Sequence, residues 1–539
     1  MTIEARATTL SWRDAAAAAL LAVVLLGGAS QRMVPGVVGA FHDDAVYAIT
    51  AKSLAEGHGY RLLNMPGQPR QTKYPILYPA LISAGWAAGS TLETRLFAMQ
   101  SMTAAAGGVA IALVYLYCVR FGAASRPAAL AGCLVAASSP QFLYYCGQTL
   151  SEMPFLALLV VALWGAELRL RASERSAVRD LACGVLLALP LLCRSAGVVV
   201  PLVAVVMFAR ERRPLRWLVI GVLVVVVPWL LWAAKAVHTE DDAVVGYQTD
   251  YLGWWLVNGS VAVVATNLFH AGAAFCTGAV EAAARELHAR VEQPQRILFA
   301  VGSLPWIAVV AGCRRQALLP VTLLSYLALI CLWPWPPDRF LVPILPLLAV
   351  LFAEALRRLV ASRGLGRPGT AVLALLLAAA VGSNVWMQSR YAGVSRPSQY
   401  PYFTLPGEPV QWRSYLAAFD WLRTHTRDGE VLAAGFDTMT SLYTDRPSIR
   451  PFVVRPLALY YGFAEPPLGT VAEFEEILDA HAARYLFVSP LPAYQEEQAF
   501  FDLVSDAIEQ RPGLLKRVWQ AGDDERFLIF EVAQRHAAG

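Results

Sequence analysis

The sequence predicts a mainly α-helical, polytopic membrane protein with a small α/β domain at its C-terminus. Of its 539 residues, 57% are hydrophobic and only 16% are charged, which is more apolar than a soluble enzyme. Apolar segments long enough to cross a bilayer recur as far as residue 388. Beyond that point the composition is that of a soluble protein, in which helical and extended periodicities alternate.

We predict about eleven membrane spans, because a helix needs about 20 mainly apolar residues to cross a hydrocarbon core of roughly 30 Å. The weakest pair, 180–193 and 195–209, is interpreted as two short crossings with Arg194 at the outer tip, since arginines flank the pair on both sides. The predicted spans are residues 12–33, 95–119, 128–145, 151–168, 180–193, 195–209, 215–236, 296–313, 317–335, 339–359 and 369–388.

Arginine clusters between the spans predict the topology, because basic residues collect on the cytoplasmic side of a membrane. They place the N-terminus in the cytoplasm and the C-terminus outside the cell (inner) membrane, and they favour topology over nucleic-acid binding as the origin of the net charge of +4. The clusters are Arg6 and Arg13, Arg120 and Arg126, Arg169 to Arg179, Arg210 to Arg216, Arg314 and Arg315, and Arg357 to Arg367.

This topology divides the chain into a membrane domain, residues 1–388, a linker, 389–410, and an extracytoplasmic α/β domain, 411–539. The membrane domain has two large outer loops, 34–94 and 237–295. In the C-terminal domain the apolar periodicity predicts helices at 415–426 and 471–483, and strands at 430–436, 484–489, 515–520 and 526–532.

The sequence carries no recognisable metal-ligand spacing. Its eight cysteines lie mostly in apolar runs without a CxxC pair, which favours buried small side chains over disulfides or zinc. In the second outer loop, His238, Glu240, Asp241 and Asp242 favour a solvated acidic turn over a metal site. No cofactor is predicted, and a divalent metal is left open.

The first outer loop holds the strongest candidates for chemistry. Asp43 and Asp44 head a predicted helix that ends at Gly57, with Tyr47 one turn from Asp43. Acids at a helix start are ordinary N-terminal caps, but a carboxylate at a membrane surface can also take a proton from an attacking hydroxyl. Lys73 suits a lipid phosphate, or is a lysine that snorkels to the interface.

Three further charges adjoin apolar segments. Glu152 opens the fourth span in Ser-Glu-Met-Pro, where an acid is also ordinary helix-start chemistry. Arg194 lies between two apolar runs, and an intramembrane charge is a functional candidate by default. Arg339 is predicted at the outer end of the tenth span, where a second guanidinium facing Arg194 would form a phosphate clamp.

These residues resemble the C-fold (GT-C) glycosyltransferases, and most closely the family 39 branch with its protein O-mannosyltransferases and lipid A aminoarabinose transferases. The run Asp43-Asp44-Ala45-Val46-Tyr47 followed by AKSLAEGHGY is similar to the family's Asp-Glu-Ala-x-Tyr and leucine-alanine-x-glycine pattern. The other matching motifs are Lys73-Tyr74-Pro75, the segment TLSEMP that contains Glu152, and RFLVP, which begins at Arg339.

The resemblance implies a polyprenyl-phosphate-linked sugar donor in the outer leaflet and transfer with inversion. It implies catalytic roles for Asp43, Asp44 and Glu152, although Asp44 stands where the family has Glu. It further implies that Lys73, Arg194 and Arg339 bind the donor phosphate, and we expect Tyr47 and Tyr74 to contact substrate.

We therefore predict a membrane glycosyltransferase that moves a sugar from a polyprenyl-phosphate carrier to an envelope acceptor, which is a lipid, a glycan or a protein. The expected partners are the lipid-linked sugar, the bilayer and that acceptor, without nucleic acid. A transporter or flippase of lipid-linked sugars is the alternative, because intramembrane charges also line transport paths. An envelope scaffold would leave the charges unexplained.

Overall fold

The computed structural model describes residues 8–235, 242–258, 260–274, 294–312, 318–392, 412–491, 496–521 and 525–533. The chain forms two compact units. Unit 1 comprises Met1–Met33, Ser101–Leu230 and Ser260–Gly393. Unit 2 comprises Val34–Gln100, Leu231–Gly259 and Val394–Gly539, so the first predicted outer loop belongs to the same unit as the C-terminal domain.

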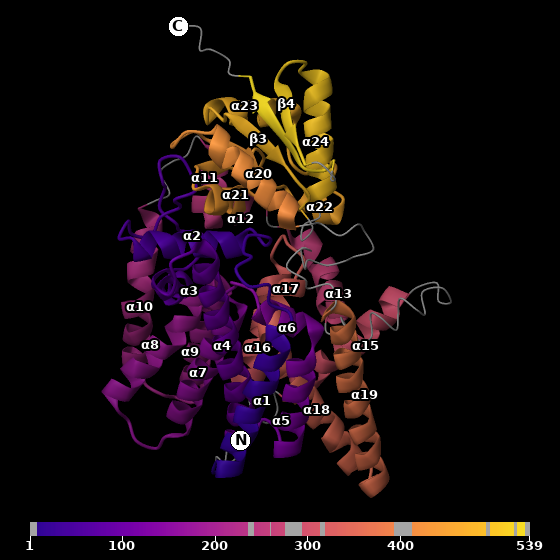
Figure 1. Ribbon diagram of the computed structural model, residues 1–539. Helices are drawn as coiled ribbons and strands as arrows, with labels where there is room; N and C mark the ends of the chain where they lie inside the picture. Colours follow the sequence, from indigo (N-terminus) through magenta and orange to yellow (C-terminus); the bar gives the residue numbers. More distant parts are fainter. Residues whose placement is uncertain are drawn as a thin grey trace. The chain divides into compact units, whose positions relative to one another are not determined.

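Unit 1 is a helical bundle (Figure 1). Its helices are α1 (Trp12–Ser30), most of α4 (Leu92–Arg120), α5 (Arg126–Ser138), α6 (Pro140–Cys146), α7 (Glu152–Arg171), α8 (Ala177–Cys193), α9 (Val199–Arg210), most of α10 (Arg216–Ala234), α13 (Val264–Ala274), α15 (Pro294–Gly312), α16 (Leu318–Cys331), α17 (Asp338–Leu341), α18 (Leu345–Ser362) and α19 (Gly366–Ala392), with short 3-10 turns at Ser195–Val198, Val261–Val263 and Val342–Ile344.

Six helices in the described part of the chain are long and apolar enough to cross a membrane: α1, α4, α7, α10, the continuous segment Asp338–Ser362 and α19. Shorter apolar helices include α5, α9, α13, α15 and α16. The helical membrane fold is confirmed, whereas the count of eleven spans stays a prediction.

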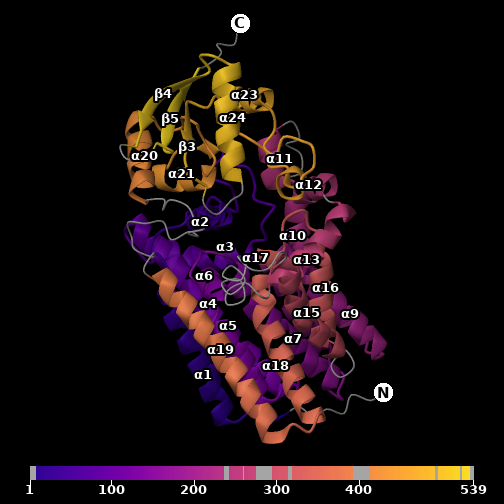
Figure 2. The ribbon, with the colours of Figure 1, turned by 90° about the vertical axis from the view of Figure 1, so that its right-hand side faces the viewer.

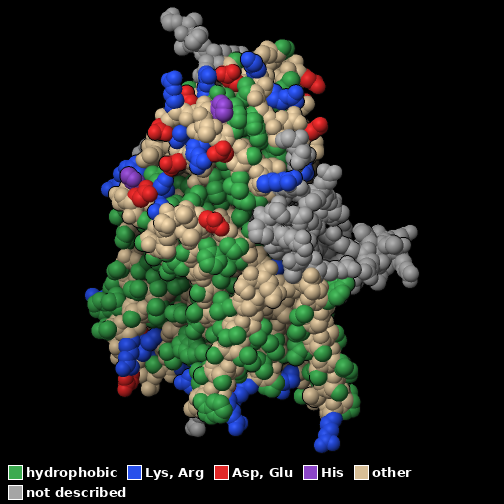
Figure 3. All heavy atoms as spheres, viewed as in Figure 1, with side chains coloured by type: hydrophobic (Ala, Val, Ile, Leu, Met, Phe, Trp, Pro, Cys, Tyr) green, Lys and Arg blue, Asp and Glu red, His purple; other side chains and the backbone are tan. Residues whose placement is uncertain are grey.

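Ion pairs and hydrogen bonds join the arginine clusters at one end of unit 1. Arg126 of α5 pairs with Asp14 of α1 at 2.7 Å, and Arg213 donates to the Leu170 carbonyl of α7 at 2.8 Å. Glu354 of α18 accepts from the Ser125 hydroxyl at 2.9 Å. Lys and Arg side chains gather at the lower end of these helices in Figure 3, below a wide hydrophobic band. This clustering fits the predicted parity, but the side of the membrane stays a prediction.

The predicted pair of short helices is present as α8 and α9. Arg194 stands between them in an extended conformation, and a 3-10 turn follows it. Gly197 allows this turn, because a Cβ atom there would lie 2.3 Å from the Pro190 backbone. The reversal places Arg194 at the end of the pair that lies away from Arg179 and Arg210.

The predicted outer loop 237–295 is more structured than a loop. Unit 2 holds α11 (Ala243–Thr249) and α12 (Tyr251–Asn258), and unit 1 holds α13. Asn267 of α13 donates to the carbonyls of Cys331 and Trp333 at 3.1 and 2.8 Å. The sequence does not predict α13, because its apolar run of 11 residues is too short for a membrane span.

The residues considered for a metal site lie partly outside the described chain. His238, Glu240 and Asp241 are outside it, whereas Asp242 caps α11 and pairs with His481 at 3.1 Å. Within the described ranges no group of three His, Cys, Asp or Glu side chains is arranged to hold a metal ion. The described cysteines are free and buried, while Cys276 and Cys313 lie outside those ranges.

The C-terminal part of unit 2 is built on a five-stranded sheet of order β2-β1-β3-β5-β4. β1 pairs in parallel with β2 and β3, whereas β5 is antiparallel to β3 and β4. The elements are α20 (Trp412–His425), β1 (Leu432–Ala434), α21 (Asp437–Thr444), β2 (Ser448–Ile449), α22 (Pro456–Tyr461), α23 (Val471–Ala480), β3 (Tyr485–Val488), α24 (Glu496–Gln510), β4 (Leu515–Gln520) and β5 (Leu528–Val532).

Helices cover both faces of this sheet. Tyr485 and Phe487 of β3 contact α20, where Phe487 meets Tyr415 and Phe419 edge-on at 6.4 and 5.9 Å. The alternating Leu486 points to the other face, and Figure 2 shows α24 on the side of the strands away from α20. The predicted strands and helices are all present, and α21, β2, α22 and α24 are additional.

The predicted outer loop 34–94 packs onto this α/β domain. Its helices are α2 (Asp43–Ala55) and α3 (Leu77–Ile82), followed by a 3-10 turn at Ser83–Ala87. The end of α2 is as predicted, because Gly57 adopts a positive φ of 78°. Ser448 of β2 donates its amide to the Asn64 carbonyl at 2.6 Å, and Tyr443 donates to the Gly36 carbonyl at 3.0 Å.

Two glycines let α8 and α10 touch through their backbones. A Cβ at Gly184 would lie 2.0 Å from the Leu218 carbonyl oxygen, and one at Gly221 would lie 2.2 Å from that of Leu181. We predict that Gly221→Leu lowers the free energy of unfolding by about 1–3 kcal/mol through overpacking, although leucine is the better helix former.

Thermal unfolding in detergent micelles measures this loss. Gly382→Leu in α19 is the matched control, because nothing lies within 4 Å of a Cβ there. Equal midpoints for the two variants would contradict the close approach of α8 and α10.

Candidate functional site

Unit 1 brings together three of the predicted site residues at the ends of separate helices. Glu152, the first residue of α7, is fully buried. Its Oε1 lies 2.8 Å from Nη1 of Arg194, and 2.7 Å from Nε of Arg339 in α17. The carboxylate therefore bridges two guanidinium groups that would otherwise repel each other.

The bridge fixes the arginines and occupies one oxygen of the acid. Arg194 also donates to the Ser151 hydroxyl at 3.1 Å and lies 5.7 Å from the Phe340 ring. Oε2 of Glu152 is buried and has no hydrogen-bond partner among the described residues. A carboxylate held between two cations is a weak base, so this geometry favours charge neutralisation over proton transfer.

Unit 2 holds the other predicted residues, beginning with Asp43 at the start of α2. The Tyr74 hydroxyl donates to Oδ1 of Asp43 at 2.6 Å. Burial, followed by the charge of Asp43, raises the pKa of Tyr74 above its usual value, so the phenol keeps its proton. Tyr47 packs edge-on against Tyr74 and Tyr78, with ring centroids 5.2 and 4.9 Å apart. The tyrosines thus orient the half-buried Asp43 carboxylate.

Asp44 differs sharply from its neighbour. It is fully buried, and its oxygens accept the backbone amides of Gly39, Phe41 and Ala45 at 2.7, 3.1 and 3.0 Å. Burial raises the pKa of Asp44 to about 6, although these amides oppose the rise. The hydrogen bonds fold the chain back before α2, so the geometry of Asp44 favours a structural role.

Lys73 is buried beneath an aromatic ring. Its Nζ lies 3.5 Å from the centroid of Tyr247 in α11, a cation–π contact, and 5.5 Å from that of Tyr74. Burial lowers the pKa of Lys73 to about 7, although the Asp43 carboxylate opposes this. The amine therefore exchanges its proton close to neutral pH.

The α/β domain contributes charged residues to the same part of unit 2 that sequence reasoning missed. Asp437 pairs with His42 at 2.9 Å and accepts from the Asn64 amide at 3.3 Å. Arg450 lies 3.7 Å from the same carboxylate. A usable signal existed, because Asp437 follows a predicted strand, and ligand-binding residues gather at the carboxyl ends of parallel strands. Arg450 gave no such signal, because β2 has only two residues.

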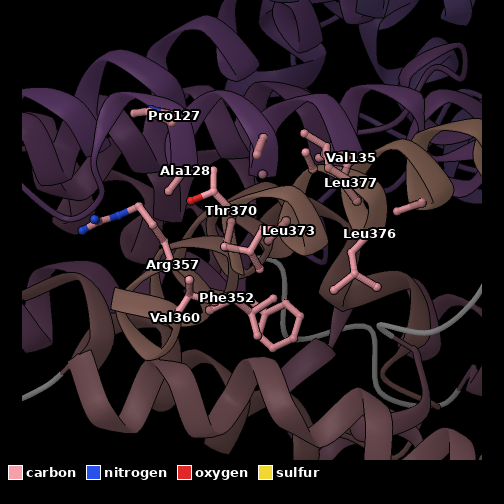
Figure 4. Close-up of a pocket in the computed structure, with 18 of the residues that line it drawn as sticks. Pro127, Ala128, Val135, Phe352, Arg357, Val360, Thr370, Leu373, Leu376 and Leu377 are labelled. Atoms are coloured by element: carbon pink, nitrogen blue, oxygen red, sulfur yellow. The ribbon is translucent and has the colours of Figure 1, made fainter. Parts of the chain in front are cut away.

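A separate cavity of about 1210 Å³ lies within unit 1 among α5, α18 and α19. None of the predicted site residues lines it, and its walls are largely alanine, valine and leucine. This composition suits an apolar chain rather than the reacting groups. Residues of all three helices that line it include Pro127, Ala128, Val135, Phe352, Arg357, Val360, Thr370, Leu373, Leu376 and Leu377 (Figure 4).

Solved structures share this fold along nearly the whole chain. ArnT from Cupriavidus metallidurans bound to undecaprenyl phosphate is 15% identical, with a TM-score of 0.54 and coverage of 97% of this chain and 98% of that one. The archaeal oligosaccharyltransferase AglB from Archaeoglobus fulgidus, in complex with an inhibitory peptide and a dolichol-phosphate, is 12% identical, with a TM-score of 0.54 and coverage of 97% and 74%.

No protein-family model matches the sequence, and no curated protein sequence matches it. The resemblance to the GT-C glycosyltransferases is confirmed at the level of fold. Together with its long apolar helices, this fold makes the chain a multi-pass membrane protein.

The salt bridges of Glu152 generate a prediction about stability. Glu152→Gln removes the carboxylate shared by the buried Arg194 and the partly exposed Arg339, so we expect a loss of about 3–5 kcal/mol in the free energy of unfolding. Removing one cation as well, in Glu152→Gln combined with Arg194→Gln, is expected to recover part of this loss.

Thermal unfolding of the wild type, both single variants and the double variant provides the coupling free energy. Additive effects of the two substitutions would rule out the bridge.

Proposed function

We propose that this protein is a membrane glycosyltransferase that takes a sugar from a polyprenyl-phosphate carrier and attaches it to an envelope acceptor. The observation that carries the proposal is the fold shared along the chain with ArnT bound to undecaprenyl phosphate and with AglB in complex with a dolichol-phosphate. The acceptor class is a lipid, a glycan or a protein, and the sugar is a hexose or pentose.

Arg194 and Arg339 are proposed to bind the donor phosphate. Guanidinium groups are always charged and match phosphate oxygens in geometry, and Glu152 holds both within 2.8 Å of one carboxylate oxygen. Neutralising the developing charge on a departing phosphate is the main help that such a reaction needs. Glu152 is then a positioning residue, which revises the catalytic role expected from the family resemblance.

Asp43 is proposed as the general base. The acceptor hydroxyl attacks the anomeric carbon, its proton passes to Asp43, the bond from that carbon to the phosphate oxygen breaks, and the polyprenyl phosphate departs with the electron pair. Attack opposite the leaving group inverts the anomeric centre. Tyr74, at 2.6 Å from Oδ1, orients the base, while Tyr47 supports Tyr74 and Asp44 supports the turn before α2.

Lys73 is proposed as a further cation for the donor phosphate. Burial makes the ammonium form of Lys73 costly, and a bound phosphate would add an anion that favours the charged amine. The proposed mechanism requires no metal.

The predicted topology completes the proposal. Residues 1–388 form the membrane domain of about eleven spans and 389–410 the linker, and 411–539 lie on the outer face of the cell membrane with the N-terminus in the cytoplasm. The clustering of arginines at one end of unit 1 supports this orientation.

Asp43→Asn tests the enzyme proposal. The amide cannot take the proton, so transfer is expected to fall by about 10² to 10⁴, with the thermal midpoint nearly unchanged. The measurement is transfer from a panel of radiolabelled undecaprenyl-phosphate sugars to membrane extract by purified protein. Asp506→Asn, at an exposed site in α24, is the matched control.

Equal transfer by wild type and Asp43→Asn would remove the base from the mechanism. Movement of intact lipid-linked sugar across vesicles without transfer would instead establish the flippase.

The pKa of Lys73 predicts a pH dependence of donor binding. The folded-state pKa of about 7 lies below the ordinary value of 10.5, so the ammonium is present below pH 7 and is lost as the pH rises. Donor affinity is therefore expected to fall between pH 6 and 9, with a midpoint at or above 7, because a bound anion favours the charged amine.

Lys73→Arg isolates this effect, because arginine stays charged throughout the range while Asp44 and the other acids of the unit remain. Dissociation constants of an undecaprenyl phosphodiester report it, since that lipid keeps one negative charge over this range. The same pH profile in Lys73→Arg would exclude Lys73 as its source.

A further inference from the structure

Three charged residues follow the carboxyl ends of three adjacent parallel strands in unit 2. Asp437 comes after β1, Arg450 directly after β2, and Glu496 opens the helix after β3. Loops at this edge of an open α/β sheet are the usual place for a ligand. α21 and α22, which start from this edge, lie at one end of the sheet in Figure 1.

Glu496 stands out among them because its carboxylate is buried. Its exposed fraction is 2%, and neither carboxylate oxygen has a hydrogen-bond partner among the described residues. Burial raises the pKa of Glu496 to about 7, although the Arg450 guanidinium lowers it. An unsatisfied buried carboxyl is destabilising, and such a group in a folded protein calls for an explanation.

Other buried polar atoms nearby are also unsatisfied. In the described part of the chain, Oδ1 of Asn64, whose amide donates to Asp437, has no hydrogen-bond partner, and neither has Nε2 of Gln71, whose other amide atom accepts from the Lys73 backbone. The neighbourhood therefore offers both acceptors and a donor to a ligand that can donate and accept.

Tyrosine rings accompany these polar groups. The charges of Glu496 and Arg450 both act on Tyr247 and on Tyr460 of α22, and burial raises the pKa of both phenols, which stay neutral. Lys73 lies under the Tyr247 ring at 3.5 Å. Aromatic faces among a few fixed polar groups are typical of a small-molecule site.

We propose that Glu496 and Arg450 are specificity-determining residues that bind the hydroxyl groups of a sugar at the carboxyl edge of β2, β1 and β3. A hydroxyl donates to a carboxyl oxygen and accepts from a guanidinium or an amide. The inference rests on the proposed transferase function and gives the α/β domain a role in that function, which is recognition of the sugar.

The charges favour a neutral polyol over an anion. Asp43, Asp437 and Glu496 carry three acidic groups in this neighbourhood, against the cations of Lys73 and Arg450. A phosphate bound beside Glu496 would meet a carboxyl group, whereas a sugar hydroxyl would satisfy it. The sugar comes either from the lipid-linked donor or from an acceptor glycan.

Two sets of binding measurements, which form the two arms of the test and use the full chain in nanodiscs, distinguish these sources. The first compares farnesyl phosphate with farnesyl-phosphate-linked mannose, glucose, galactose and arabinofuranose. The second titrates the methyl glycosides of the same sugars in the presence of farnesyl phosphate. We expect the wild type to prefer one sugar in one arm, and Glu496→Gln to lose about tenfold or more of that preference.

Farnesyl phosphate alone is expected to bind Glu496→Gln and wild type alike. The thermal midpoint of Glu496→Gln is expected to stay equal or to rise, whereas a purely structural glutamate would lower it. Glu509→Gln, exposed on the same helix, is the matched control.

Unchanged sugar preference in Glu496→Gln, or no preference by the wild type in either arm, would overturn the proposed sugar-binding role of Glu496 and Arg450 while leaving the transferase untouched. A preference that is lost in Glu496→Gln, in a protein that transfers no sugar in the labelled assay, would support the proposed sugar-binding role and reject the transferase.

Discussion

The bridge of Glu152 to Arg194 and Arg339 is the interaction on which the helical unit depends. It joins the start of α7, the turn between α8 and α9, and α17, each of which begins or ends at this point. The buried guanidinium of Arg194 and the partly exposed one of Arg339 lie side by side, and a fully buried carboxylate within 2.8 Å of both offsets their repulsion. Most of the other described arginines of the unit lie at the opposite helix ends, and the span interiors are largely apolar.

In unit 2, the adjacent residues Asp43 and Asp44 are the same in sequence, but their surroundings favour different roles. Asp44 gives its lone pairs to three backbone amides and orders a turn, while Asp43 is half-buried and meets a phenol that keeps its own proton. Lys73 lies under the Tyr247 ring, and burial lowers the pKa of its amine to about 7. A base and a cation that both respond to an incoming substrate are what the proposed transfer would use.

Much of the fold could be predicted because long apolar runs and alternating strands leave strong patterns, as in α7, α10 and β3. The grouping of Glu152, Arg194 and Arg339 followed from arginine parity and helix-end chemistry. What escaped prediction was short or non-local: α13 has too few residues to resemble a span, β2 has two, and Arg450 and Glu496 reach their neighbours only through sheet topology. The pairing of Asp437 with His42 joins residues 395 positions apart, a separation that no local pattern encodes.

The two edge strands of the sheet differ from its central strands in a way that disfavours aggregation between copies in one membrane. β2 is only two residues long, and β4 carries exposed Lys516 and Arg517 together with a register shift between Arg517 and Trp519. Short, charged and kinked edges offer a poor template for another strand. Neighbouring copies confined to one bilayer meet far more often than molecules free in solution, and such edges keep their sheets from merging into aggregates.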